Sequence, residues 1–362
     1  MASRDARSFH GRQVFRWMYA CRELDPKRWT DLPAALRADL IVSAHLAVGR
    51  IVHRTPSSDA SVKYLIEPPG GGAVESVLMV KSGRVTLCLS SQVGCALGCD
   101  FCLTARMRWI RDLTPGEILG QVALIQDDRT LGDRRFNVVF MGMGEPLHNY
   151  DAVMSAVRTL TDADGFGLSR RRITISTAGL APAIERLAGE PRRPKLAVSL
   201  NATTDDVRDR IMPINRKYPL GRLLEACRRF RERTGDSFSF EYVLLEGVND
   251  TDEDVTRLAR ILRSHPAKLN LIPFNPVPGM LPFRPPPEQR VNEISKRLLD
   301  LGTRASVRWS QGADARAACG QLAVLPGERG AGALSEMGPR SAAGPPSRRA
   351  TGSRTSWGVR GS

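Results

Sequence analysis

The stretch VTLCLSSQVGCALGCDFC, residues 85–102, runs from an apolar, β-branched segment into a loop that contains three cysteines. Cys95, Cys99 and Cys102 are close together, and two neighbouring glycines allow a tight backbone turn around them. Thiolates at this spacing can bind three corners of an iron–sulfur cube. A structural zinc site needs four ligands, and no second Cys-x2-Cys or His pair lies nearby to complete them. A purely structural role for three cysteines at this spacing is disfavoured even more than a zinc site. The loop therefore predicts a 4Fe-4S cluster.

A cube held by three cysteines keeps one iron without a protein ligand. Such an iron can chelate the amino and carboxylate groups of S-adenosylmethionine (SAM) and pass an electron to its sulfonium. The cysteine spacing therefore predicts radical chemistry, with the cluster and SAM as cofactors.

Short β-branched runs alternate with amphipathic helical patterns along most of the chain. The clearest helix begins at Thr114-Pro115-Gly116-Glu117, a capping box with proline at the first helical position. Repeated βα units predict parallel strands covered by helices, here a partial α/β barrel of about six units, with its site at the carboxyl ends of the strands. The runs expected to form strands are 85–90, 136–141, 173–177, 196–200, 238–245, 269–272 and 306–309.

The chain divides into four expected segments. Residues 1–60, in which apolar residues recur at helical spacing, are predicted to form a small helical N-terminal accessory domain. Residues 61–84 form a hairpin that leads into the barrel, and residues 85–324 form the barrel core. Residues 325–362 are rich in Gly, Ser, Pro, Ala and Arg, so we expect a disordered basic tail.

The 362-residue chain is strongly basic, with 53 Lys and Arg against 38 Asp and Glu, a net charge of +15. This excess favours a polyanionic partner, RNA or DNA, although an Arg-rich composition can also reflect a GC-rich genome. The 42% hydrophobic residues argue against a wholly disordered or fibrous chain. No apolar stretch reaches the roughly 18 residues of a membrane helix, and the N-terminus has no apolar signal core. We therefore expect a cytoplasmic protein.

Further segments complete a recognisable series between residues 74 and 322. They are LTPGEILGQV, VVFMGMGEPLHNY, RRITISTAGL, KLAVSLNA, RDRIMPINRKYPL, FEYVLLEGVND, LNLIPFNPVPG and AACGQL. With these segments and the cysteine loop, the chain resembles the RlmN/Cfr family of radical SAM RNA methyltransferases. The resemblance implies a partial (βα)6 radical-SAM barrel that methylates C2 of an adenosine in the peptidyl-transferase region of 23S rRNA. The adenosine beside the tRNA anticodon is a second target that the sequence leaves open.

The segment Gly142–Pro146 follows an apolar strand, and its Glu145 carboxylate suits a cation such as the methionyl ammonium of SAM. The resemblance extends the cofactor-binding set to residues that end several predicted strands. These are Gly144, Glu145, Ser176, Ser199, Leu200, Asn201 and Asn275. Asn201 stands where many family members have His, which puts one of these contacts in doubt.

Two cysteines outside the loop, Cys88 and Cys319, match the family's methyl carrier pair. An adenine C2 or C8 carbon has no lone pair to support ordinary methyl transfer. The resemblance implies that Cys319 takes a methyl group from one SAM, and that a second SAM yields the radical that activates this methyl for addition to the base. Cys88 then forms a disulfide with Cys319 and releases the product. Without the resemblance, both would be read as buried small hydrophobic residues.

Glu75 matches the proton acceptor proposed for this family, a general base for the added ring carbon. On the residues alone it would be a solvated hairpin residue. The resemblance also implies an electron donor such as flavodoxin or ferredoxin, and we expect a monomer. Aromatic residues make up 6% of the chain, so no RNA-stacking platform is evident.

Two other functions stay open. One is Cfr-like methylation of C8 of the same base, and the other is a non-catalytic iron–sulfur protein that binds RNA. Intact Cys88 and Cys319 speak against the non-catalytic alternative.

Overall fold

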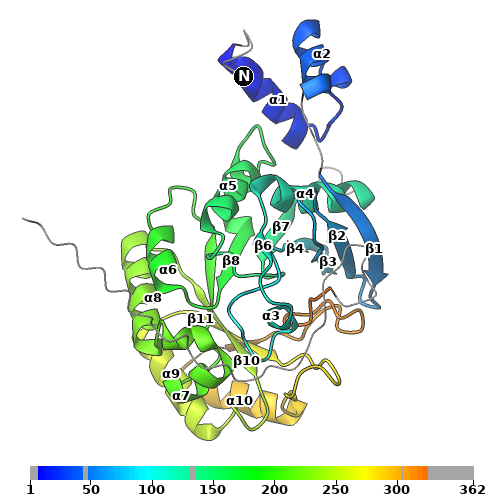
Figure 1. Cartoon of the computed structure of the whole chain (residues 1–362). Coiled ribbons are helices and arrows are strands. Elements are labelled where there is room, and N and C mark those ends of the chain that lie inside the picture. The colour runs from blue at the N-terminus through cyan, green and yellow to red at the C-terminus, as the bar shows by residue number, and fades with distance from the viewer. Residues whose placement is uncertain (1–6, 44–47, 130–134, 304, 325–362) are drawn as a thin grey trace, which may run out of the picture. The chain divides into compact units, whose positions relative to one another are not determined.

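The computed structural model describes residues 7–43, 48–129, 135–303 and 305–324. Its main feature is a sheet in the order β1-β2-β3-β4-β7-β8-β9-β10-β11-β12 (Figure 1). Strands β1 to β4 pair antiparallel, and every neighbouring pair from β4 to β12 is parallel. The strands are β1 (Arg50–Pro56), β2 (Val62–Glu67), β3 (Val74–Lys81), β4 (Arg84–Cys88), β7 (Phe136–Phe140), β8 (Ile173–Thr177), β9 (Lys195–Ser199), β10 (Ser239–Leu244), β11 (Lys268–Pro273) and β12 (Ala305–Val307).

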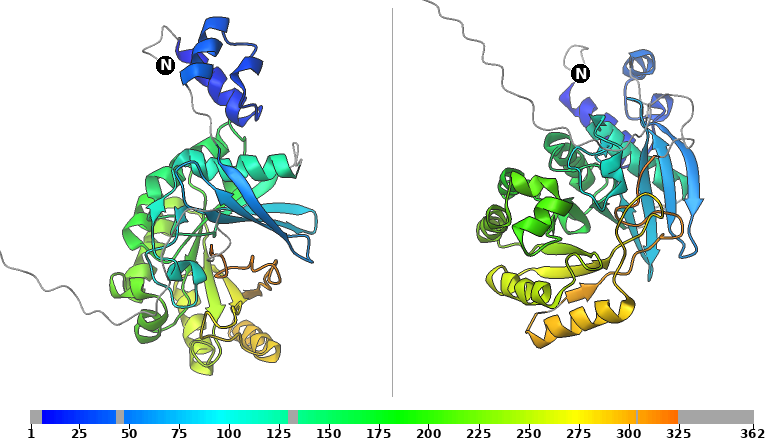
Figure 2. Two further views of the ribbon diagram at one scale, coloured as in Figure 1. Left: turned by 45° about the vertical axis from the view of Figure 1, so that its right-hand side comes forward. Right: turned by 60° about the horizontal axis from the view of Figure 1, so that its bottom comes forward.

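Helices lie along the outer side of the curved sheet (Figure 2). They are α4 (Pro115–Asp128), α5 (Tyr150–Thr161), α6 (Ala181–Leu187), α7 (Asp205–Ile211), α8 (Leu220–Thr234), α9 (Asp252–Ser264) and α10 (Glu288–Asp300). The predicted capping box is present at α4, where Thr114 and Glu117 satisfy each other's backbone N–H groups. Apolar residues of the strands and helices form one large buried core. The predicted partial α/β barrel is therefore confirmed.

The expected strands are present, and most of their ends agree within one or two residues. Residues 61–84, where a hairpin was expected, contain the antiparallel pair β2–β3, with Val62 opposite Leu78. Strand β3 pairs in turn with β4, with Val77 opposite Cys88 and Lys81 opposite Arg84. A parallel strand buried on both faces reads as a short continuous apolar run, which explains why these strands were predictable.

The helical prediction for residues 1–60 is wrong in its last part, because residues 50–56 form β1. Helices α1 (Ser8–Tyr19) and α2 (Ala34–Ser43) do lie in this segment. Strand β1 is an edge strand with exposed charged residues, so its sequence lacks a clear apolar alternation. The domain boundaries otherwise stay predictions, and the expected tail, residues 325–362, lies outside the described residues.

In the described part of the chain, no helix is both long and apolar enough to cross a bilayer.

Candidate functional site

The three predicted cluster cysteines share one loop, residues 89–113, which we call the cluster loop. Cys102 directly precedes the short helix α3 (Leu103–Arg106). The three thiols line a single cavity of about 150 Å³ at the carboxyl ends of the parallel strands. We call this the cofactor cavity. It brings together most of the residues that the sequence assigned to the cluster and to SAM.

No three His, Cys, Asp or Glu side chains within the described ranges converge on a point where one metal ion would fit. A 4Fe-4S cube takes one thiolate at each of three irons rather than three at one ion. Burial raises the pKa of Cys95 to about 12 and raises the pKa values of Cys99 and Cys102. The thiols are therefore protonated on their own, and a metal would displace their protons. The donor set fits a 4Fe-4S cluster.

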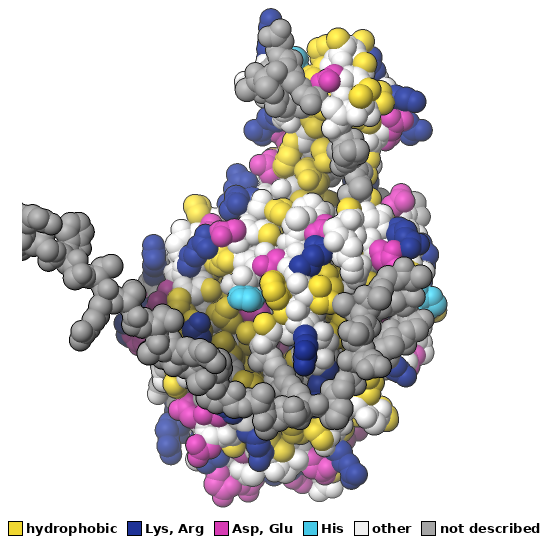
Figure 3. Space-filling view, viewed as in Figure 1, with side chains coloured by type: hydrophobic (Ala, Val, Ile, Leu, Met, Phe, Trp, Pro, Cys, Tyr) yellow, Lys and Arg dark blue, Asp and Glu magenta, His cyan; other side chains and the backbone are white. Residues whose placement is uncertain are grey.

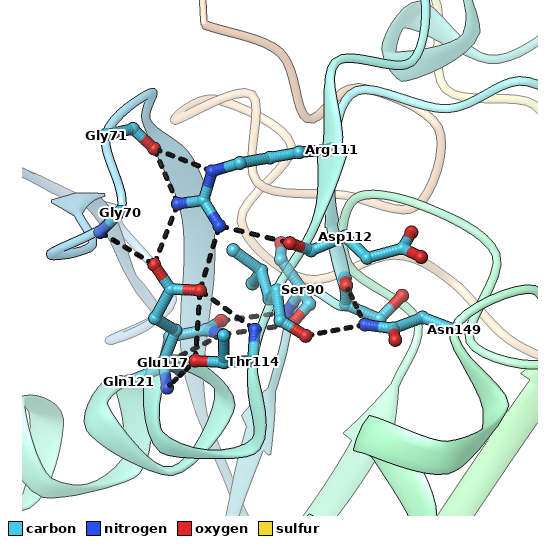
Figure 4. A network of polar contacts seen from close by, with 11 residues as sticks. Gly70, Gly71, Ser90, Arg111, Asp112, Thr114, Glu117, Gln121 and Asn149 are labelled. Atoms are coloured by element: carbon cyan, nitrogen blue, oxygen red, sulfur yellow. Dashed lines mark hydrogen bonds and ion pairs between the residues drawn. The ribbon is translucent and has the colours of Figure 1, made fainter.

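Asn149 joins the two ends of the cluster loop. Its side-chain Nδ2 donates hydrogen bonds to the carbonyl of Ser91 at 2.9 Å and to that of Leu113 at 2.7 Å (Figure 4). The N–H of Leu113 also donates to the Ser91 carbonyl. Gln121 exchanges two hydrogen bonds of 2.9 Å with the backbone of Ser90. These contacts fix where the loop leaves the sheet and where it returns.

A second contact holds the returning end of the loop to α4. Both carboxylate oxygens of Glu117 accept from Arg111 at 2.8 Å, and they also accept from the N–H groups of Gly70 and Thr114 (Figure 4). Burial by itself would raise the pKa of Glu117, but these hydrogen bonds outweigh it and lower the pKa to about 2. Glu117 is thus a carboxylate that fastens the loop.

Glu145 projects into the cofactor cavity and is buried. Its Oε1 accepts from the N–H of Leu147 at 3.0 Å, and its Oε2 accepts from the N–H of Ala178 at 2.7 Å. Burial raises its pKa to about 7. A cation in the cavity would therefore be attracted to this carboxylate and would stabilise its ionised form. Gly144 is required here, because a Cβ on it would lie 2.5 Å from the Cβ of Gln92.

The remaining expected SAM residues are only partly gathered at this cavity. Ser176, Ser199 and Asn201 line it. The side chain of Leu200 is fully buried in the core. Asn275 does not line the cavity and instead donates to the carbonyl of Cys319 at 3.1 Å. For all of the expected SAM residues, contact with SAM stays a prediction.

Asn201 adopts a left-handed backbone conformation, with φ of +54°. Asparagine tolerates this conformation better than most residues. Its Oδ1 accepts from the N–H of Val243 at 2.8 Å, and its carbonyl accepts from Asn249. Asn201 therefore joins the end of β9 to β10, a structural role that an amide can fill at this position.

Arg208, at 0% exposure, is a buried cation beside the cavity that the sequence did not single out. It donates to the carbonyls of Leu200, Ser199 and Ala178 and to Oδ1 of Asn215. Burial lowers its pKa to about 10, yet it remains charged at neutral pH. Arg208 thus holds the backbone that follows β8 and β9. An arginine in an otherwise ordinary helix gave no signal of this role.

Cys88 and Cys319 meet in a second cavity of about 640 Å³, which we call the basic cavity. Cys88 is buried at the end of β4, and Cys319 is exposed to the cavity. Desolvation by the surrounding protein raises the pKa of Cys88, and it raises the pKa of Cys319 to about 12 although part of Cys319 is exposed in the cavity. Both cysteines are free in this structure. They line the same cavity, and the disulfide between them stays a prediction.

Cys319 lines both cavities, and so does Glu241 of β10. Oε1 of Glu241 accepts from Asn270 and Ser239, each at 2.7 Å. Glu241 was not identified from the sequence, although Glu241 is a single acidic residue within an apolar strand. The two cavities therefore share a wall in which one thiol and one carboxylate stand beside Met141, Ile272 and Leu322.

Glu75 is buried, at 2% exposure, and lines neither cavity, so the alternative of a solvated hairpin residue is wrong. Its Oε1 forms an ion pair with Nζ of Lys63 at 2.7 Å, and its Oε2 accepts from the N–H of Ala323 at 2.8 Å. Ala323 belongs to the segment 310–324, which we call the C-terminal strap and which contains Cys319. Glu75 therefore fixes the position of the strap.

The comparisons with known proteins agree with this geometry. Residues 89–259 match the model of the radical SAM superfamily. The chain is 48% identical over 330 residues to the dual-specificity RNA methyltransferase RlmN of Anaeromyxobacter sp. (strain Fw109-5), covering 90% of this chain and 87% of that protein. The RlmN protein of Geobacter sulfurreducens is also 48% identical, over 87% of this chain and 86% of that one. A crystal structure of a radical SAM methyltransferase from Sphaerobacter thermophilus superposes with a TM-score of 0.84 at 44% identity, over 89% and 94% of the two chains.

Proposed function

Because the chain belongs to the RlmN-type RNA methyltransferases of the radical SAM superfamily, we propose that it methylates C2 of an adenosine in 23S rRNA. A tRNA adenosine is the second substrate in this proposal, since the relatives from Anaeromyxobacter and Geobacter are dual-specificity enzymes. The family uses a 4Fe-4S cluster and SAM. The proposal adds two SAM per turnover, a flavodoxin or ferredoxin as electron donor, and a monomeric enzyme.

The position of Cys319 is the observation that supports this proposal most directly. Its thiol faces the cofactor cavity, with the cluster cysteines and Glu145, and also the basic cavity, with Cys88. A residue that receives a methyl group from SAM and passes it to a large polyanion must face both compounds. A cysteine with a purely structural role would not need to lie at the boundary between the cofactor cavity and the basic cavity.

Cys319 acts first as a nucleophile. Its thiol loses a proton, the thiolate attacks the methyl carbon, and the C–S bond to the sulfonium breaks with the electron pair staying on the departing thioether. Because its pKa is raised to about 12, the thiolate is scarce in the free protein. A positive charge in the cofactor cavity would lower that pKa and so couple methylation to cofactor binding.

When bound, the cluster and a second SAM supply a radical that removes one hydrogen atom from the S-methyl group of Cys319. The methylene carbon of Cys319 then bonds to C2 of the base, which loses its C2 proton and one electron, and that electron would pass to the oxidised cluster. Glu75 is the proposed acceptor of the proton. Because it lines neither cavity, its Oε2 would first have to give up the Ala323 N–H to reach the base. Cys88 attacks the sulfur of Cys319, forms the disulfide, and leaves the methylene carbon to take up a proton as the new methyl group.

The test is a pair of cysteine variants assayed without oxygen on unmodified RNA. Cys88→Ala should accumulate a covalent protein–RNA adduct, and Cys319→Ala should transfer no methyl group. Normal turnover of either variant would contradict the scheme. Mass spectrometry of nucleosides from the wild-type reaction should show 2-methyladenosine, whereas 8-methyladenosine would favour the Cfr-like alternative.

A further inference from the structure

Basic residues begin most of the parallel strands of the barrel. Arg84, Lys195 and Lys268 are the first residues of β4, β9 and β11, and Arg135 and Arg172 directly precede β7 and β8. The amino ends of parallel strands lie at the same edge of a sheet. We call these five residues the basic rim. The rim thus lies at the end of the barrel opposite to the cofactor cavity.

The rim opens into the basic cavity. Arg84, Arg172 and Lys195 line that cavity, and the same three line a neighbouring hollow of about 580 Å³ together with Arg135. The cavity extends from there to Cys88 and Cys319. Glu241, at its inner end, is the one acidic residue among the residues that line the two spaces. A polyanion at the rim would therefore reach the methyl carrier through a basic channel.

The rim residues lack the acidic partners that several other basic residues have in the described part of the chain. Within the described ranges, none of the five forms an ion pair, whereas Arg170 and Arg193 pair with Asp236, and Arg228 and Arg229 pair with Glu225. Desolvation, followed by the charges of Lys268 and Arg308, lowers the pKa of Lys195. On the face shown in Figure 3, basic side chains lie among acidic ones. Cations gathered without counter-charges attract an anion.

Trp309 adds an aromatic surface at the same cavity. It follows β12, lines the basic cavity, and has 49% of its surface exposed. Its neighbour Arg308 lines the cavity as well. An exposed indole beside cations is an arrangement that binds single-stranded RNA, with bases stacking on the ring and phosphates on the cations. Because the sequence contains few aromatic residues, it gave no indication of this stacking surface.

We propose that the RNA enters the barrel at its amino end, where the basic rim binds the phosphates that flank the target nucleotide, and that Trp309, which follows β12 on the wall of the same basic cavity, stacks on an RNA base. The target base passes through the basic cavity to Cys319, and SAM occupies the opposite end. This inference rests on the proposed function for the identity of the polyanion. It assigns the RNA to a site that shares only its inner wall with the cofactor.

The test measures binding of an unmodified stem-loop RNA with an adenosine-containing loop by fluorescence anisotropy, from 50 to 200 mM KCl. Arg172→Ala/Lys195→Ala should weaken binding about tenfold at 150 mM and reduce the slope of log K against log [KCl] by about 1.4, two phosphate contacts at roughly 0.7 each. The matched control is Arg228→Ala/Arg229→Ala on α8, which removes the same charge. Equal binding by the rim variant and the control would overturn the proposal.

Trp309→Ala should weaken binding about tenfold with an unchanged salt slope, and Trp309→Phe should restore it, because stacking needs an aromatic face. Failure of phenylalanine to restore binding would overturn the stacking assignment. All variants should keep the wild-type content of cluster iron after anaerobic reconstitution, which shows that the cofactor end is intact. If rim-dependent binding holds but the product is not 2-methyladenosine, the proposed function fails and the RNA site stands.

Discussion

The two ends of the barrel differ in how they are built. At the carboxyl end, a small cavity is bordered by the cluster loop, which Asn149 and Glu117 fasten, and by the backbone after β8 and β9, which Arg208 holds. At the amino end, a cavity about four times larger is bordered by cations without acidic partners among the described residues. Exact hydrogen bonding suits a small cofactor that must bind in one geometry. Cations without acidic partners suit a long polyanion, which can bind in many geometries.

This difference predicts that damage at one end leaves the other intact. Cys99→Ala removes one of the three thiolates at the carboxyl end, so anaerobically reconstituted protein should lose nearly all of its cluster iron. RNA affinity should stay unchanged. Iron analysis and anisotropy on one preparation check both statements, with Cys21→Ala, an exposed cysteine outside both cavities, as the control. Full iron content in the Cys99 variant would refute the ligand assignment.

The C-terminal strap lies between the two ends of the barrel. Weakening its attachment to Glu75 should have the next largest effect. Lys63→Met leaves the buried Glu75 carboxylate without its cation, which should destabilise the protein by about 3–5 kcal/mol. Arg228→Met removes exposed ion pairs with Glu225 and Glu232 and should destabilise the protein far less, because exposed ion pairs contribute little. Urea unfolding of both variants measures the difference. Equal losses would show that the Lys63–Glu75 pair does not hold the strap.

The fastening of the cluster loop predicts a pH dependence. Glu117 has a folded-state pKa of about 2 against an ordinary value of 4.5, so the unfolded chain binds more protons between these values. Its contribution, about 3 kcal/mol, is complete above about pH 5 and disappears as the pH falls toward 2. The stability advantage of the wild type over Glu117→Gln should therefore shrink between pH 5 and pH 3. Curves of stability against pH that run parallel for the wild type and Glu117→Gln would contradict this. Arg111→Met should also abolish the stability advantage that Glu117 provides.

The smallest effect is expected at Asn149. Asn149→Asp keeps the shape of the side chain but cannot donate to the carbonyls of Ser91 and Leu113, which should cost about 2 kcal/mol. Cluster iron should also be retained less well on dilution. A variant with wild-type stability and wild-type iron retention would show that the loop is fixed by its other contacts.

The sequence predicted the parts of the molecule whose signal is local. Buried parallel strands appear as apolar runs, and the cluster cysteines lie within eight consecutive residues. It missed β1, an edge strand whose polar residues face solvent, and it missed Asn149, since asparagine is common in turns. The sequence did not reveal the basic rim, for another reason. Its members lie far apart in the sequence, and arginine is frequent throughout the chain.

The resemblance supplied residues that composition could not. It singled out Cys88 and Cys319, which the fold brings into one cavity although they are far apart in the sequence. It also supplied Glu75 as a base, and there the structure adds a contact with the strap that no motif encodes. Arg208 and Glu241 were outside both kinds of reasoning, because their roles depend on which backbone segments the barrel places beside them.

The strap follows every strand of the barrel in the chain, and it is bonded to segments made long before it. Gly320 accepts from the N–H of Leu103, the Leu322 carbonyl accepts from Thr104, and Ala323 donates to Glu75. During translation, Cys319 therefore emerges after all the strands and docks onto segments that are already present. A polypeptide that stopped before the strap would have the cysteines of the cluster loop without Cys319, and under the proposed mechanism it could not begin the reaction.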